Sequence, residues 1–74
     1  MTGDNLLPYA VIAAATRGEV EAMERVVKHY EGYMRYLSTR KLRREDGSGY
    51  LGVDQDIYDR LKAKLIRAVL EFEV

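Results

Sequence analysis

The strongest constraint on the fold is a run of apolar residues with helical spacing in the middle of the chain. From residue 20 onward, apolar residues recur at i, i+3, i+4 and i+7, so at about 100° per residue they fall on one arc of a helix. The other side is charged, with acidic residues four positions before basic ones, a pairing that stabilises helices. A helix with two such sides must bury its apolar face against another element. The arc consists of Ala22, Met23, Val26, Val27, Tyr30, Tyr33, Met34 and Leu37.

Two shorter helices are predicted on either side of this one. Pro8 favours a helix start, because its missing N–H would be unpaired at the first position in any case. Gly18 favours a helix end, because glycine readily takes the left-handed conformation just past the last turn. These two residues predict a helix over residues 8–17. Asp54 is a favourable N-cap for a last helix. The spacing of the apolar residues after it predicts that this helix extends to residue 72.

Chain length and composition limit how such helices are held together. The chain has 74 residues and no cysteine, so no disulfide supports it. A domain this small buries only about 60% of the surface of its unfolded chain, which leaves a thin margin of stability. Stability must therefore come from helix packing, from a partner, or from a second copy. We predict a single domain, 1–74, with an all-α fold: a small three-helix bundle with helices at about 8–17, 20–41 and 54–72, a Gly-rich loop at 43–53, and disorder at 1–5. The loop leaves room for a short extended piece at "YLGV" (50–53).

The last helix carries a second apolar strip. This strip lies roughly 150° from the main apolar arc of the helix, so one neighbour cannot cover both. The first helix would cover it if the last helix lay between the other two. Alternatively, a second protomer could cover the strip, which would give a homodimer. The strip is therefore a candidate interaction surface. Its residues are Ala63, Ile66 and Leu70.

Basic residues gather at two places although the net charge is zero, with 12 Lys and Arg against 12 Asp and Glu. The first group ends the predicted middle helix, where cations complement the helix dipole. An alternative interpretation is that these side chains contact phosphates and fix position rather than read sequence. The second group lies at i, i+4 and i+7 on the last helix, either as a solvated face or as auxiliary contacts. The groups are Arg40, Lys41, Arg43 and Arg44, and Arg60, Lys64 and Arg67.

Several classes of protein lack support in the sequence. His29 is the one histidine and there is no cysteine, so neither a zinc site nor any other metal centre is predicted. No nucleophile turn or phosphate-binding loop is present, so we expect no catalytic activity and no cofactor. No apolar run approaches the roughly 20 residues of a membrane span, and no signal peptide is visible. We expect a cytoplasmic protein that does not bind membranes.

The segment "GEVEAMERVVKHYEGYM" (18–34) resembles the start of conserved region 2 of bacterial sigma factors. In that region a short helix, a turn with glycine and an acid, and a long amphipathic helix recur. The resemblance implies a module that binds RNA polymerase, a sigma factor or itself, with the second apolar strip as the contact.

A closer resemblance extends from about residue 6 to the end of the chain. It is to the small helix-turn-helix domain proteins encoded by conjugative transposons of Gram-positive bacteria. The resemblance implies DNA binding or transcription regulation on a mobile element, and it brings no catalytic residues. One departure is Glu19, where aspartate would be the better N-cap. The segments that carry it are "LLPY" (6–9), "HYEGY" (29–33), "LSTR" (37–40) and "KLIRAVLEF" (64–72).

A helix-turn-helix joins its two helices by a turn of three or four residues, which in this sequence fits only the break at Gly18. The second helix of the pair would then begin with Glu19, Glu21 and Glu24, and acids at that end repel phosphates. Any DNA contact is therefore expected from residues 40–44 and from the last helix.

Overall fold

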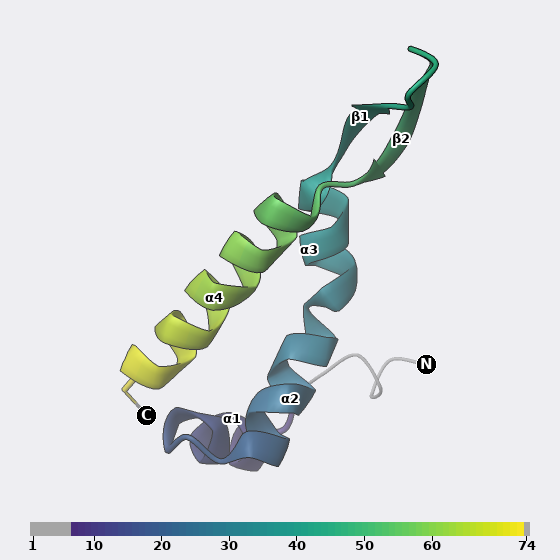
Figure 1. The fold of residues 1–74 in the computed structure, drawn as a ribbon. Coiled ribbons are helices and arrows are strands. Elements are labelled where there is room, and N and C mark those ends of the chain that lie inside the picture. Colours follow the sequence, from purple (N-terminus) through teal and green to yellow (C-terminus); the bar gives the residue numbers. More distant parts are fainter. Residues whose placement is uncertain (1–6, 74) are drawn as a thin grey trace.

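The structure, a computed structural model, describes residues 7–73. Figure 1 shows α1 at one end of the molecule, a β-hairpin extending beyond the helices at the other, and α4 running back alongside α3. The all-α prediction is therefore wrong in part, because two antiparallel strands interrupt a mostly helical chain. The disorder predicted for residues 1–5 lies outside the described residues. The elements are α1 (Tyr9–Thr16), α2 (Val20–His29), α3 (Glu31–Ser38), β1 (Thr39–Arg43), β2 (Gly49–Val53) and α4 (Gln55–Glu71).

The turn between α1 and α2 forms at the predicted glycine. Gly18 has φ +87°, a conformation that glycine adopts without strain. The N–H of Gly18 donates to the carbonyl oxygen of Ala15, and the N–H of Glu19 donates to that of Ala14. These two bonds form a Schellman motif, which satisfies carbonyls at the helix end. At the other end of α1, Pro8 is the N-cap, so the helix begins one residue later than predicted.

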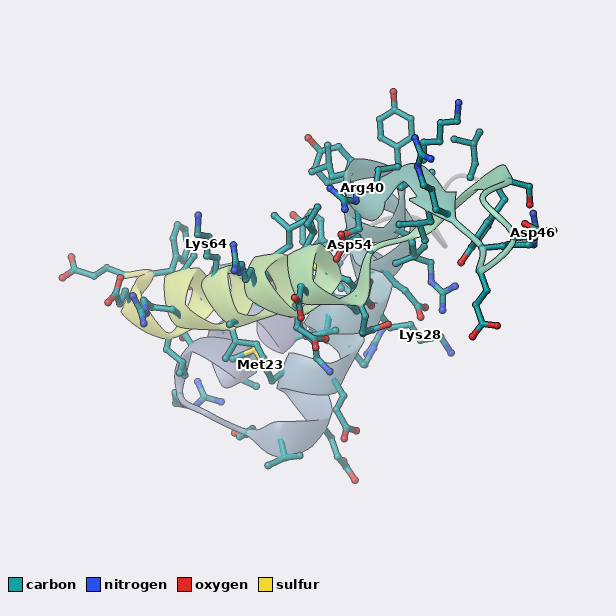
Figure 2. The ribbon with its side chains drawn as sticks, turned by 45° about the horizontal axis from the view of Figure 1, so that its top comes forward. Met23, Lys28, Arg40, Asp46, Asp54 and Lys64 are labelled. Carbon is teal, nitrogen blue, oxygen red and sulfur yellow. The ribbon has the colours of Figure 1, made fainter. Side chains whose placement is uncertain are left out.

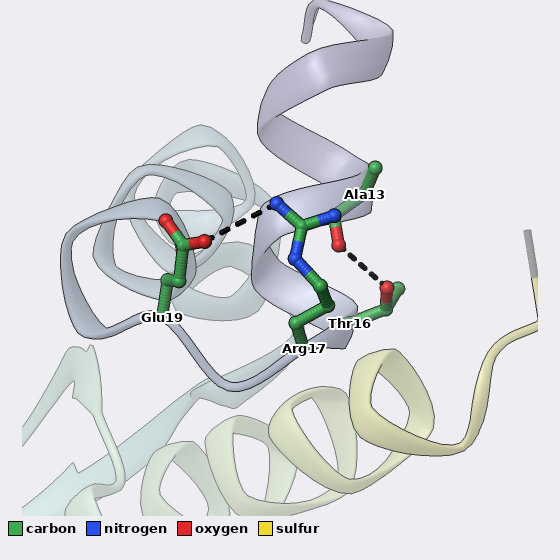
Figure 3. A network of polar contacts seen from close by, with 4 residues as sticks. All are labelled: Ala13, Thr16, Arg17 and Glu19. Carbon is green, nitrogen blue, oxygen red and sulfur yellow. Dashed lines mark hydrogen bonds and ion pairs between the residues drawn. The ribbon is translucent and has the colours of Figure 1, made fainter.

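Figure 3 shows the polar contacts that close this turn. The hydroxyl of Thr16 donates to the carbonyl oxygen of Ala13 over 2.7 Å. Arg17 pairs with Glu19 over 3.2 Å, from one side of the turn to the other. Glu19 is the N-cap of α2 but makes no capping hydrogen bond with its side chain, as expected for a glutamate at this position.

The predicted middle helix, 20–41, is interrupted at Tyr30. This residue has φ −97° and ψ 4°, and it is both the C-cap of α2 and the N-cap of α3. Its N–H still donates to carbonyls of α2 and its carbonyl accepts from Met34, so the chain continues in nearly the same direction. Gly32 follows directly after the break, and nothing lies within 4 Å of the position that its Cβ would occupy. No other described segment therefore packs closely against Gly32.

The same helix also ends earlier than predicted, at Ser38. The hydroxyl of Ser38 donates to the carbonyl oxygen of Met34 over 2.7 Å, and that of Thr39 donates to Arg35 over 2.7 Å. These side chains occupy carbonyls of the last turn. Thr39 has an extended backbone and opens β1.

The segment predicted as a Gly-rich loop at 43–53 is the second half of the hairpin. Strand β1 pairs with β2 in a register that joins Thr39 to Val53 and Arg43 to Gly49. The N–H of Gly47 donates to the carbonyl of Arg44, and the N–H of Arg44 donates to that of Ser48. With Gly47 at φ +90°, this is a three-residue hairpin connection with a left-handed glycine at its last position.

Helix α4 begins at the predicted cap. Oδ1 of Asp54 accepts the N–H groups of Asp56 over 3.0 Å and Ile57 over 3.3 Å. The helix packs on the others with half-buried side chains, and within 55–71 no residue is fully buried. Leu65 and Val69 of α4 complete the small core around Ala15, Ala22 and Val26.

The molecule is elongated for its size. Its radius of gyration is 15.4 Å, whereas a compact chain of this length has about 11 Å. The hairpin projecting from the helices, at the end opposite α1, adds to this length (Figure 1). Among the described helices, none is long and apolar enough to cross a membrane.

Candidate nucleic-acid interface

The first basic group lies on the hairpin and not at a helix end. Arg40, Lys41 and Arg43 belong to β1, and Arg44 is the first residue after it. The interpretation of this run as charges complementing the dipole of a helix over 20–41 is therefore wrong. Because successive residues of a strand point to opposite faces, the group divides between two faces of the hairpin.

The register defines these two faces, because directly opposite residues share a face. We call one the packed face and the other the open face. The packed face consists of Arg40, Leu42, Arg44, Tyr50 and Gly52, and the open face of Thr39, Lys41, Arg43, Gly49, Leu51 and Val53.

On the packed face both arginines have partners. Nε of Arg40 lies 2.8 Å from Oδ2 of Asp54. The guanidinium carbon of Arg44 lies 4.4 Å from the centroid of the Tyr50 ring, a cation–π contact. A Cβ at Gly52 would lie 3.1 Å from the Tyr50 ring and 3.2 Å from Leu42, so the glycine makes room for both. Tyr50 therefore positions Arg44.

On the open face, neither cation forms an ion pair with any described residue. The side chain of Lys41 extends across Gly49, where its Cε would be 2.7 Å from an added Cβ. Leu51 lies directly opposite Lys41 and is 76% exposed. The open face is thus a surface of two free cations beside an uncovered leucine.

The tip of the hairpin is acidic. Glu45 and Asp46 are exposed there. The carboxylate of Asp46 accepts the backbone N–H of Ser48 over 2.9 Å and its hydroxyl over 2.7 Å. These bonds, the backbone one first, lower the pKa of Asp46 because they stabilise the ionised form. Polyanions are therefore repelled at the tip and attracted along the strands.

The second basic group, Arg60, Lys64 and Arg67, is exposed on α4. Figure 2 shows Lys64 and Arg40 on one side of the molecule, with Met23 and Lys28 on the opposite side. The sequence reasoning therefore placed both groups on exposed surfaces. It did not find that the hairpin separates its own four cations into two faces.

The start of α2, which follows the turn at Gly18, carries the opposite charge. Glu21 and Glu24 are exposed there, and Val20 is 70% exposed. Arg17 is paired with Glu19, so it adds no free positive charge. The expected acidic beginning of this helix is present at the surface.

An open apolar groove of about 640 Å³ lies between α2 and α4. Of the second apolar strip, Ile66 and Leu70 line this groove, and Ala63 is exposed outside it. The lining residues come from 18–31 and 58–70, so the groove is not covered by α1. The first helix instead packs near Leu65 and Val69.

Tyr50 and Leu51 complete the hairpin surface because β2 pairs with β1, whereas the sequence indicated only a short extended piece at 50–53 without a partner strand. A signal was present in Asp46-Gly47, because this dipeptide favours the turn of a hairpin. Leu51 lies on the face of Lys41 because the register pairs these two residues. Within residues 7–73, no group of three or more His, Asp or Glu side chains could hold a metal ion.

Two helices joined by a three-residue turn with a left-handed glycine define a helix-turn-helix protein. The chain matches the model of the family described as "Helix-turn-helix domain" over residues 9–73, and it belongs to this family. The match runs from the first residue of α1 past the end of α4, so the hairpin is part of the family's domain. Searches of the curated proteins and of the solved structures gave no match.

Proposed function

We propose that this helix-turn-helix domain binds duplex DNA and regulates transcription, with the β-hairpin as the main contact. The observation that carries the proposal is the hairpin itself, which projects from the helices and bears four cations. Phosphate contacts supply most of the affinity of a protein for DNA. An exposed ribbon with cations on both faces presents them to a duplex without rearrangement of the helices.

The second helix of the turn supports this assignment by its charge. A standard recognition helix brings its N-terminal residues to the base edges. Glu21 and Glu24 would meet phosphates as that helix entered a groove. The hairpin and α4 avoid this repulsion. Arg60, Lys64 and Arg67 are proposed as auxiliary phosphate contacts because they are exposed in a row on α4.

The biological context is proposed from the resemblance to proteins of conjugative transposons. In that context the protein is an accessory regulator of a mobile element, and it acts on DNA in the cytoplasm. The whole chain, 1–74, is taken as one domain with this role. The function requires no catalytic group and no cofactor.

The test is a titration of random and element-derived duplex DNA at several salt concentrations. The matched variants are Lys41→Glu with Arg43→Glu, on the open face, and Glu21→Gln with Glu24→Gln, at the start of α2. The first pair should abolish binding, because two attractive contacts become repulsive, while the melting temperature stays unchanged. The second pair should bind as well as the wild type or better. Unaltered binding by the first pair would contradict the proposal.

We also propose a second candidate function, favoured by the open groove between α2 and α4. An uncovered apolar surface of this kind typically marks an interaction site. Leu70 is 48% exposed at this groove, and Ile66 is only half-buried. The partner would be RNA polymerase, a sigma factor or a second copy of this chain.

This candidate is tested with purified components. Sedimentation velocity reports self-association, and surface-immobilised protein reports binding of RNA polymerase or a sigma factor. Leu70→Gln should weaken the interaction, while Leu37→Gln, a change at a similarly exposed leucine of α3 (45% against 48%), should not. A monomer that binds neither protein excludes the interaction module and leaves the DNA proposal standing.

A further inference from the structure

Leu51 is a highly exposed apolar side chain on the hairpin. Its 76% exposure is the highest among the exposed large apolar side chains within 7–73. Burying a leucine is worth about 1.5–3 kcal/mol, and Leu51 gains almost none of this in the fold. It lies in the middle of β2, so its side chain extends from the open face. The exposed leucine therefore serves the fold poorly and is free to enter a ligand.

The neighbours of Leu51 specify the charge of that ligand. Lys41 lies directly opposite, and Arg43 is two residues further along the same face. A lysine stem often covers an apolar neighbour. Here Lys41 instead leans across Gly49 toward the turn, which leaves Leu51 uncovered. Both cations belong to β1 and so lie on one side of Leu51, which means that the ligand must offer negative charge beside an apolar crevice.

The hairpin tip restricts the approach. Glu45 and Asp46 would meet phosphates if the hairpin entered DNA with its tip first. The packed face is also less suited, because Arg40 and Arg44 are held by Asp54 and Tyr50. The open face is thus the side that can lie against a polyanion.

We propose that the open face lies over the minor groove of duplex DNA, with Lys41 and Arg43 on phosphates and Leu51 inserted between two base pairs. The insertion partly unstacks the step and bends the duplex, as apolar wedges from minor-groove proteins do. The proposal rests on the proposed DNA-binding function and adds a mode of binding to it. It also makes the protein selective for steps that unstack easily.

Unstacking costs a few kcal/mol, and pyrimidine–purine steps such as TA deform most readily. A mismatch lowers the cost further, because its pairing is already weak. The wild-type protein should therefore prefer a duplex with a central T·T mismatch over the matched duplex. Because only an inserted side chain requires the step to unstack, this preference should be about tenfold for the wild type and should vanish in Leu51→Ala.

The experiment uses short duplexes with and without a T·T mismatch, dyes at both ends, and 2-aminopurine beside the central TA step. Affinity, end-to-end energy transfer and 2-aminopurine fluorescence are measured together. Wild type should bend the duplex and raise the fluorescence as the step unstacks. Leu51→Ala should still bind with similar salt dependence but without bending or unstacking. The matched control Leu37→Ala, on α3, should behave like wild type.

Four results would contradict the insertion of Leu51. If wild type binds without bending or unstacking, Leu51 does not insert, although DNA binding stands. If Leu51→Ala bends the duplex as wild type does, another residue is responsible. A preference for thymine without unstacking would mean that Leu51 contacts methyl groups in the major groove. If wild type binds no duplex even at low salt, both the wedge and the proposed function are wrong.

Discussion

Asp54 joins the hairpin to α4, because its Oδ2 lies 2.8 Å from Nε of Arg40 while its Oδ1 accepts the N–H of Asp56 over 3.0 Å. One carboxylate thus caps a helix and holds a strand. In addition, its N–H donates to the carbonyl of Ser38, where α3 ends. The direction in which the hairpin projects is set at this junction.

Two substitutions of Asp54 distinguish the contribution of its helix cap from that of its ion pair with Arg40. Asp54→Ala should lower the free energy of unfolding by about 1–2 kcal/mol, since a lost N-cap costs about 1 kcal/mol and the pair adds a little. Asp54→Asn keeps a good cap and should cost at most about 0.5 kcal/mol. Urea denaturation measures both. Equal losses for the two variants would mean that the ion pair, and not the cap, dominates.

The two glycines Gly18 and Gly32 should respond in opposite directions to alanine. Gly18 has φ +87° and open space around it, so Gly18→Ala adds only backbone strain, about 1–2 kcal/mol of destabilisation. Gly32 is helical and equally unobstructed, so Gly32→Ala should stabilise by about 0.5–1 kcal/mol. Thermal melting of both variants decides this. A destabilising Gly32→Ala would indicate that the break at Tyr30 needs the glycine.

The small core should be sensitive at Val26. This side chain is 3% exposed, whereas Val20 on the same helix is 70% exposed. Val26→Ala should destabilise by about 2 kcal/mol, from two lost methyl groups and a residual cavity. Val20→Ala should change the free energy of unfolding by less than about 0.5 kcal/mol. If the two variants melted alike, Val26 would not belong to the core.

The sequence was sufficient for features fixed by local chemistry. The left-handed turn at Gly18 follows from the conformational freedom of glycine, and the cap at Asp54 follows from the orphan N–H groups of α4. Both are properties of a few neighbouring residues. The helical arc of α2 and α3 was also predicted, because its period extends over many residues.

The pairing of two strands was missed because periodicity gives little signal over five residues. Residues 39–41 continue the charged pattern of the preceding helix, so they were predicted as its last turn. Two side-chain hydroxyls, of Ser38 and Thr39, end the helix, and Gly47 permits the turn that returns the chain. The sequence predicted one cluster of four cations. The structure divides them between two faces of the hairpin, and only the cations of the packed face have partners.

Salt dependence should identify which cations contact phosphates. Each phosphate contact adds about 0.9 to the slope of log affinity against log salt. Lys41→Ala and Arg43→Ala should each lower this slope by about 0.9. Arg40→Ala should lower it less, because that side chain is held by Asp54. If all three variants kept the slope of the wild type, the phosphate contacts would lie elsewhere, and the basic residues of α4 would be the next candidates.

The turn of the hairpin should depend on acid in a defined direction. Ser48 lowers the pKa of the Asp46 carboxyl below its ordinary value, through its backbone N–H first and its hydroxyl second. A depressed folded-state pKa stabilises the turn above the ordinary, unfolded pKa, and this contribution is lost as pH falls through the folded pKa. Carboxyl-carbon NMR shifts of Asp46 report the titration. Ser48→Ala removes only the hydroxyl bond, so it should raise the pKa part of the way toward the ordinary value. An Asp46 that titrates at the ordinary value in the wild type would show that the turn is not closed by these bonds in solution.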